Sequence, residues 1–295
     1  MISTIEFAAL GGSFVQVSAK REDVSAFVYR LKNLSIDTRF LPPEPSCPDQ
    51  VFFSHIFEGT AVWHRASIFE EGPLEGSATH RRHYSQQQAP YYRRTRGDLL
   101  GLAIGVPRTW APEVDEPVPM GGRIYADALE LGLHMLERRD ESSLDFVNAM
   151  LDGWIHHLHA EGFLPKRERR TTSAQDVRAA ADREMLKALA GVLGATASRP
   201  AVVDLASALG LSERQIARRL QKVLPLIESP SKNFREMAHR WRILVAGVLM
   251  ASRPDERISV IAEHAGFSST AALDHCFKSA GLDSPTELLQ QLSTR

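Results

Sequence analysis

The 295-residue sequence has few cysteines, no long apolar run and almost no net charge. Its only two cysteines, Cys47 and Cys276, cannot form a disulfide framework and fit a reducing compartment. The longest strongly apolar run covers nine residues, 243–251, whereas a membrane-spanning helix needs about 20. Residues 1–20 contain Glu6 and no positive charge near their start, so they do not fit a secretory signal. We therefore expect a cytoplasmic protein with no membrane partner.

The sequence also lacks the short motifs of common enzymes. It contains no nucleophile elbow, P-loop, GxGxxG or HExxH, so we expect no catalytic residue and no cofactor. His156, His157 and His159 lie near Glu161, but only His157 and Glu161 have the i, i+4 spacing of two ligands on one helix. Histidines at the end of a helix interact favourably with its dipole. We expect this role for them and no metal site.

The charge is divided unevenly along the chain. Residues 185–295 contain 14 Lys and Arg against 10 Asp and Glu, a net charge of +4, which leaves −5 for the remainder. A basic tail behind an acidic body points weakly to a polyanionic partner, and chance unevenness explains it equally well. Apolar residues at 43% and charged residues at 24% fit a soluble globular protein of about two domains.

Hydrophobic patterns divide the chain into a β-rich part and a helical part. Short apolar or aromatic runs at 14–17, 51–57 and 99–106 predict strands, while residues 24–34 have helical spacing and predict a short helix. Helices are predicted over 124–138 and 142–161, and again after a charged linker near 166–173. We expect an α+β multidomain fold with a β-rich domain at 1–120, a helical dimerisation region and linker at 121–172, and an all-helical domain at 173–295.

Two segments of the helical tail repeat one pattern. Residues 205–212 and 261–269 both read apolar, Ala, three residues, Gly, apolar and Ser, with Gly210 and Gly266 separated by 56 positions. Gly permits the left-handed turn that ends one helix, and Ser can cap the next. The helix that follows each Ser has apolar residues at i, i+4 spacing. One such hairpin is as readily a plain structural element, but two copies favour paired helix-turn-helix units.

Together these residues resemble the AraC/XylS family of bacterial transcription regulators, over roughly residues 186–292. The best stretch is 258–269, and it continues through Phe277, Lys278, Gly281, Ser284 and Pro285. The resemblance implies a helix-turn-helix at about 201–223, a linker helix at about 231–252 and a second helix-turn-helix at about 257–280. It implies double-stranded DNA as the partner, with the two recognition helices in successive major grooves about 34 Å apart. Between Leu220 and Arg242 the chain has more positions than the family pattern, which leaves the relative placement of the two units open.

The expected DNA contacts fall on the two recognition helices. The first has a net charge of +3, and Arg and Gln side chains are able to read guanine and adenine. The second is neutral, with His275 where the family usually has Arg and Asp274 beside it, so we expect it to contact mainly the backbone. A solvated charged face remains the alternative interpretation. The full expected set is Ser212, Arg214, Gln215, Arg218, Arg219, Lys222, Ser268, Ser269, Thr270, His275 and Lys278.

For the body, the resemblance implies a cupin-like barrel or sandwich that senses a small molecule, with helices 123–139 and 142–161 forming a homodimer seam. Basic and aromatic residues alternate around Arg82, Tyr92 and Arg94, which either hold an anionic effector or decorate an exposed hairpin. The expected function is a sequence-specific DNA-binding transcription regulator. Gating by that effector, a role as activator and RNA polymerase as a further partner are additional expectations. The alternatives are a helical protein-interaction module that does not bind DNA specifically and an enzyme fused to a DNA-binding tail.

Overall fold

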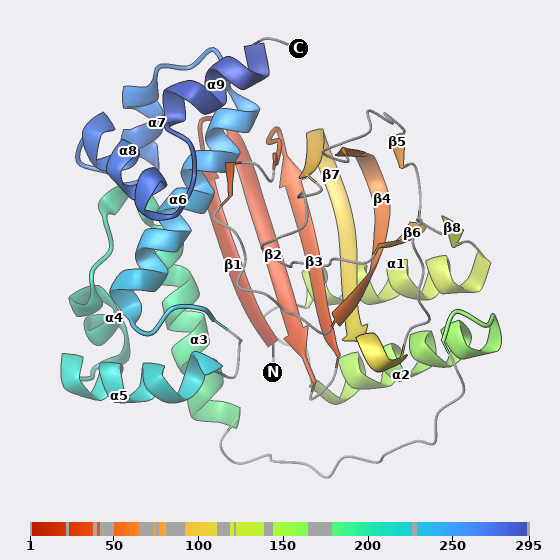
Figure 1. Ribbon diagram of the computed structural model, residues 1–295. Coiled ribbons are helices and arrows are strands. Elements are labelled where there is room, and N and C mark those ends of the chain that lie inside the picture. The colour runs from red at the N-terminus through yellow and green to blue at the C-terminus, as the bar shows by residue number, and fades with distance from the viewer. Residues whose placement is uncertain are drawn as a thin grey trace.

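The computed structural model describes residues 2–21, 24–37, 40–41, 50–64, 73–74, 77–80, 92–110, 119–120, 122–138, 144–164, 179–225 and 229–293. Its first part is an antiparallel sheet, and its second part is helical (Figure 1). This α+β arrangement confirms the predicted fold class. The strands are β1 (Ile2–Ala9), β2 (Gly12–Lys20), β3 (Ser25–Lys32), β4 (Gln50–His64), β5 (Pro73–Leu74), β6 (Ser77–His80), β7 (Tyr92–Pro107) and β8 (Pro119–Met120).

The described strands form one sheet rather than two stacked sheets. Their order is β1-β2-β3-β7-β4-β6-β8, with β5 paired to β4 beside this path. Every pairing is antiparallel, and β4 shifts its register against β7 between Ile56 and Glu58 and again between Glu58 and Thr60. Gly59 lies at this irregularity with φ +82°, a conformation that glycine adopts without strain.

The helix predicted over 24–34 is wrong, because this segment contains strand β3. The strand lies between β2 and β7 and is covered on both faces. Ala26 and Val28 are buried in one cluster of apolar side chains, and Tyr29 and Leu31 in another. A strand buried on both faces loses the strict apolar–polar alternation that identifies a half-exposed strand, so its apolar residues also fit a helical period.

Two helices cover one face of the sheet. They are α1 (Gly122–Glu137) and α2 (Leu144–Ala160), which pack on each other and on the strands. Trp154 of α2 is fully buried, and its ring meets that of Phe53 edge-on with centroids 5.3 Å apart. The core on this face therefore combines residues from the predicted β-rich domain, such as Phe53, with residues from the predicted helical region, such as Trp154.

The helical tail begins with α3 (Ala179–Gly194), which lies along edge strand β1 (Figure 1). A short 3-10 turn at Thr196–Ser198 follows it. The remaining helices are α4 (Val202–Leu209), α5 (Glu213–Val223), α6 (Phe234–Ser252), α7 (Ile258–His264), α8 (Thr270–Ser279) and α9 (Pro285–Ser293).

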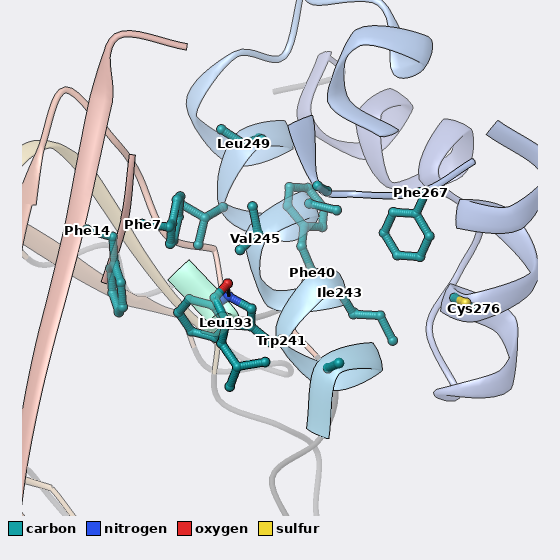
Figure 2. Packing of buried hydrophobic residues seen from close by; sticks show 14 of the residues in the cluster. Phe7, Phe14, Phe40, Leu193, Trp241, Ile243, Val245, Leu249, Phe267 and Cys276 are labelled. Atoms are coloured by element: carbon teal, nitrogen blue, oxygen red, sulfur yellow. Dashed lines mark hydrogen bonds between the residues drawn. The ribbon is translucent and has the colours of Figure 1, made fainter. Parts of the chain in front are cut away.

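The sheet and the helical tail share one hydrophobic core. Phe7 and Phe14 of the first hairpin stack with centroids 5.5 Å apart, and Phe7 meets the ring of Trp241 in α6 edge-on at 5.8 Å. Figure 2 shows Trp241 beside Phe7 and Leu193, with Phe267 and Cys276 on the other side of α6. Because one cluster crosses from β1 and β2 into α3 and α6, the two parts of the chain are packed together and not merely tethered.

A candidate nucleic-acid interface

Helices α4 and α5 form the first helix-turn-helix unit. Gly210 ends α4 with φ +63°, and the amide of Leu211 donates to the carbonyl of Ala206 at 3.0 Å. Ser212 begins α5: its Oγ accepts from the amide of Gln215 at 3.4 Å. The left-handed glycine and the capping serine lie where the repeated sequence pattern predicts them.

One face of α5 is buried, and the other carries the positive charge. Ile216, Leu220 and Val223 are at most 2% exposed and hold the helix against the tail core. The expected readers lie away from that core. Ser212, Arg214, Gln215, Arg218 and Lys222 are exposed, and Arg219 is half-buried. The basic side chains of α5 therefore face solvent, with Arg219 partly covered.

Gln215 already has a structural role. Its Oε1 accepts from both the amide and the Oγ of Ser212, each at 2.9 Å, which completes a capping box. A bidentate contact with adenine needs this same oxygen as an acceptor. Gln215 would have to leave the cap in order to read a base, so we assign it first to holding the start of α5.

Helices α7 and α8 form the second unit. Gly266 has φ +77°, and Ser269 caps α8 by accepting from the amide of Ala272 at 3.1 Å. Leu273, Cys276 and Phe277 face the core. The expected contact residues of this unit, Ser268, Ser269, Thr270, His275 and Lys278, are all exposed.

The positive charge on α8 is compensated within the helix. Lys278 Nζ lies 2.8 Å from Asp274 Oδ2 one turn earlier. This hydrogen bond and the negative charge of Asp274 raise the pKa of Lys278. Helix α8 thus presents a neutral pair, whereas the basic side chains of α5 have no ion pair with any described residue.

Two arginines that sequence reasoning did not assign to DNA fasten the units to each other. Arg199 has φ +58° and donates to the carbonyl of Phe267 at 3.2 Å, while Arg242 of α6 donates to the carbonyl of Pro200 at 3.3 Å. A Cβ at Gly266 would lie 2.2 Å from the carbonyl oxygen of Thr196. The turn of the second unit therefore lies directly against the chain that enters the first.

Helix α6 connects the two units and also anchors them to the sheet. The indole Nε1 of Trp241 donates to the carbonyl of Leu193 at 2.7 Å and to Thr196 Oγ1 at 2.9 Å. At the other end of α6, the amide of Ser35 donates to Ser252 Oγ at 2.7 Å, and Arg253 donates to the carbonyl of Leu10 at 3.3 Å. The linker helix begins at Phe234 rather than at 231, with Asn233 as its cap.

The structure describes little of the expected effector residues. Arg82 lies outside the described residues. Tyr92 and Arg94 belong to β7, opposite His64 and Val62 of β4, and their side chains lie outside the described part. The expected effector site in the body thus stays a prediction.

The histidines of α2 have structural partners. His157 pairs with Asp127 of α1, and His159 Nδ1 lies 3.1 Å from the carbonyl oxygen of Leu164. Within the described residues, no group of three or more His, Cys, Asp or Glu side chains is arranged to hold a metal ion.

A buried histidine in the body escaped the sequence analysis. His55 of β4 is fully buried, with its ring 5.8 Å from that of Trp154 and 6.1 Å from that of Phe57. Burial lowers its pKa from 6.5 to about 3. His55 lies within the predicted strand 51–57, and nothing in that apolar pattern indicated that its imidazole is buried in the core.

No described helix is long and apolar enough to cross a membrane.

Comparison with known proteins gives similarity at the structural level. No family model matches the sequence. No curated protein matches it either. ToxT from Vibrio cholerae aligns with 91% of this chain and 98% of its own, at 16% identity and a TM-score of 0.32. The AraC-like transcriptional activator CuxR aligns with 85% of this chain and 91% of its own, at 12% identity and a TM-score of 0.34. A structure of ToxT with a bound unsaturated fatty acid aligns at a TM-score of 0.31. Because these TM-scores are low, we base the functional inference on the geometry of this chain alone.

Proposed function

We propose that this chain is a sequence-specific DNA-binding transcription regulator of the AraC type. The observation that carries the proposal is helix α5: a buried apolar face fixes it, a capping box starts it, and Arg214, Arg218 and Lys222 extend from its exposed face. Arg side chains in a major groove make bidentate contacts with guanine, while Lys mainly holds phosphate. Because the charge of α8 is compensated, we assign base reading to α5 and expect α8 to make only neutral hydrogen bonds to the DNA backbone.

The test is selection of binding sites from a pool of random duplexes. We expect the full-length protein to enrich a common sequence, and we expect Arg218→Ala to bind that sequence less tightly. Lys32→Gln, a change at the exposed end of β3, is the matched control because it removes a positive charge far from α5 in sequence and outside the expected dimer seam. Enrichment of no sequence, or equal binding of wild type and Arg218→Ala, would contradict the proposal.

The further features of such a regulator are part of the same proposal. We infer a homodimer whose seam includes the outer side of α1 and α2, where Phe146 is 47% exposed and its ring lies 4.1 Å from that of His134. Phe146→Glu is expected to shift the protein from dimer to monomer in sedimentation equilibrium. An unchanged mass would show that this face is not the dimer interface. A small-molecule effector and RNA polymerase are its expected partners, activation its expected role, and the cytoplasm its expected location.

One observation favours a second function. The neutral Asp274–Lys278 pair on α8 suits a protein partner better than a polyanion. In that case the helical tail would be a protein-interaction module, and the site selection described above would enrich nothing.

A further inference from the structure

A cavity of about 520 Å³ opens inside the helical tail, between the start of α4, one side of α5 and the first half of α6. Its floor is apolar and includes Pro200, Leu220, Phe234 and Ala238. Cavities of this size accept small organic molecules, and apolar walls supply most of the contact area in such sites. All of the described lining residues belong to the helical tail, between Arg199 and Arg242.

Four of the seven polar side chains that line this cavity are positively charged, and the other three are Gln221, Asn233 and His239. Arg199, Lys232, Arg235 and Arg242 all line the cavity, and none of the described lining residues is Asp or Glu. Four permanent cations without a lining carboxylate make the cavity attractive to a negative charge.

Arg242 has one donor that the described part of the chain does not satisfy. It is half-buried, it donates through Nη2 to the carbonyl of Pro200, and its buried Nε has no hydrogen-bond partner in the described part of the chain. Burial lowers its pKa and the charge of Arg199 lowers it further, against an opposing contribution from Cys276. A buried guanidinium with an unmet donor is costly unless an acceptor is provided.

We propose that this cavity binds a small amphipathic anion, with its charged head group on Arg199, Arg235 and Arg242 and its apolar body on the floor. A carboxylate or a phosphate ester supplies the same acceptor oxygens to arginine. Ala217, Leu220 and Gln221 belong to α5, so a bound anion places negative charge next to the recognition helix. This inference rests on the proposed function. We expect that an anion bound in the cavity weakens DNA binding.

The test compares biphenyl-4-carboxylate with its neutral analogue biphenyl-4-carboxamide by isothermal titration calorimetry, on full-length protein without DNA. We expect the carboxylate to bind at least tenfold more tightly than the amide. Arg235→Gln, an exposed change, is expected to weaken carboxylate binding at least fivefold, as is Ala217→Phe, which fills the cavity. Lys32→Gln is the matched control and should bind as wild type does. Thermal melts show whether each variant is folded.

No carboxylate binding up to millimolar concentration, equal binding of the amide, or unchanged binding by both cavity variants would overturn the site. These results do not involve DNA, so they are distinct from a failure of the proposed function. In a second step, saturating carboxylate should lower the affinity of wild type for its selected duplex at least threefold and leave Arg235→Gln unaffected. If Arg235→Gln instead binds the carboxylate normally and loses DNA affinity, these cations hold phosphate and the inference is wrong.

Discussion

At the scale of single residues, the proposed DNA binding depends on which side chains are not already used in hydrogen bonds or ion pairs within the protein. Gln215 illustrates the point, because its amide oxygen is used by Ser212 at the start of α5. Lys278 illustrates it again, because Asp274 compensates its charge. The exposed arginines of α5 have no comparable described hydrogen bond, which leaves Arg214 and Arg218 as the strongest candidates for base contacts.

Arg218→Ala should cost about 1–3 kcal/mol of binding free energy on the selected duplex and reduce discrimination at one base pair. His275→Ala should cost less, because α8 carries no net charge from Asp274 and Lys278. Fluorescence anisotropy on the selected duplex and on single-base variants of it measures both effects. A larger loss for His275→Ala than for Arg218→Ala would reverse the roles of the two helices.

His55 makes the stability of the body depend on pH. The folded protein holds the pKa of His55 at about 3, whereas in the unfolded chain it returns to about 6.5. The unfolded state therefore binds the proton first as the pH falls, and the neutral imidazole's contribution, fully present above pH 6.5, is lost toward pH 3. This difference between the folded and unfolded pKa of His55 corresponds to roughly 4–5 kcal/mol of unfolding free energy.

Denaturant unfolding between pH 7 and pH 4 measures this effect. His55→Gln should lose less of its unfolding free energy over this range than wild type does. The exposed His156→Gln is the control and should follow wild type. An equal loss for His55→Gln and wild type would show that other groups cause the acid sensitivity.

At the scale of elements, the repeated pattern is the part that the sequence predicts best. Gly and Ser act locally, through a left-handed turn and a cap, so their consequences are visible in a few adjacent residues. Strand β3 was missed because its neighbours on both faces, not its own period, decide its structure. The contact of Arg199 was missed for the same reason, since its carbonyl partner lies 68 positions away in sequence.

The two turn glycines provide a matched pair. Gly210 and Gly266 both have positive φ, so alanine at either position should cost about 1–2 kcal/mol. A Cβ at Gly210 meets nothing within 4 Å, whereas one at Gly266 collides with the carbonyl of Thr196. In denaturant unfolding, Gly266→Ala should therefore be clearly less stable than Gly210→Ala. Equal stabilities would contradict the close contact between the second unit and the entry to the first.

At the scale of the whole molecule, the sheet and the helical tail behave as one packed body. Hydrogen bonds at Ser35 and Leu10 and ring contacts at Phe7 connect α6 to the first strands. The sequence predicts a domain boundary after residue 172 because the charged linker near 166–173 interrupts the hydrophobic pattern. No local pattern indicates that α3 returns to lie against β1.

Gly247 tests this shared packing. It lies in α6 where a Cβ would come within 2.4 Å of the carbonyl oxygen of Phe40, so Gly247→Ala should force the body away from the linker helix and lower stability. Gly191 in α3 is the control: a Cβ there meets nothing within 4 Å, and Gly191→Ala should stabilise the protein by up to about 1 kcal/mol. Thermal unfolding of both variants measures the difference. Stabilisation by Gly247→Ala would mean that α6 and the Phe40 segment are not in contact.

The salt dependence of binding to the selected duplex tests the central claim most directly. If the cations of α5 face DNA, the logarithm of the association constant should fall linearly with the logarithm of salt concentration, with a slope of about −0.9 for each phosphate neutralised. Lys222→Ala should make that slope shallower by about one contact, whereas Lys32→Gln should leave it unchanged. A slope near zero, or the same slope for wild type and Lys222→Ala, would contradict the assignment of α5 to the duplex.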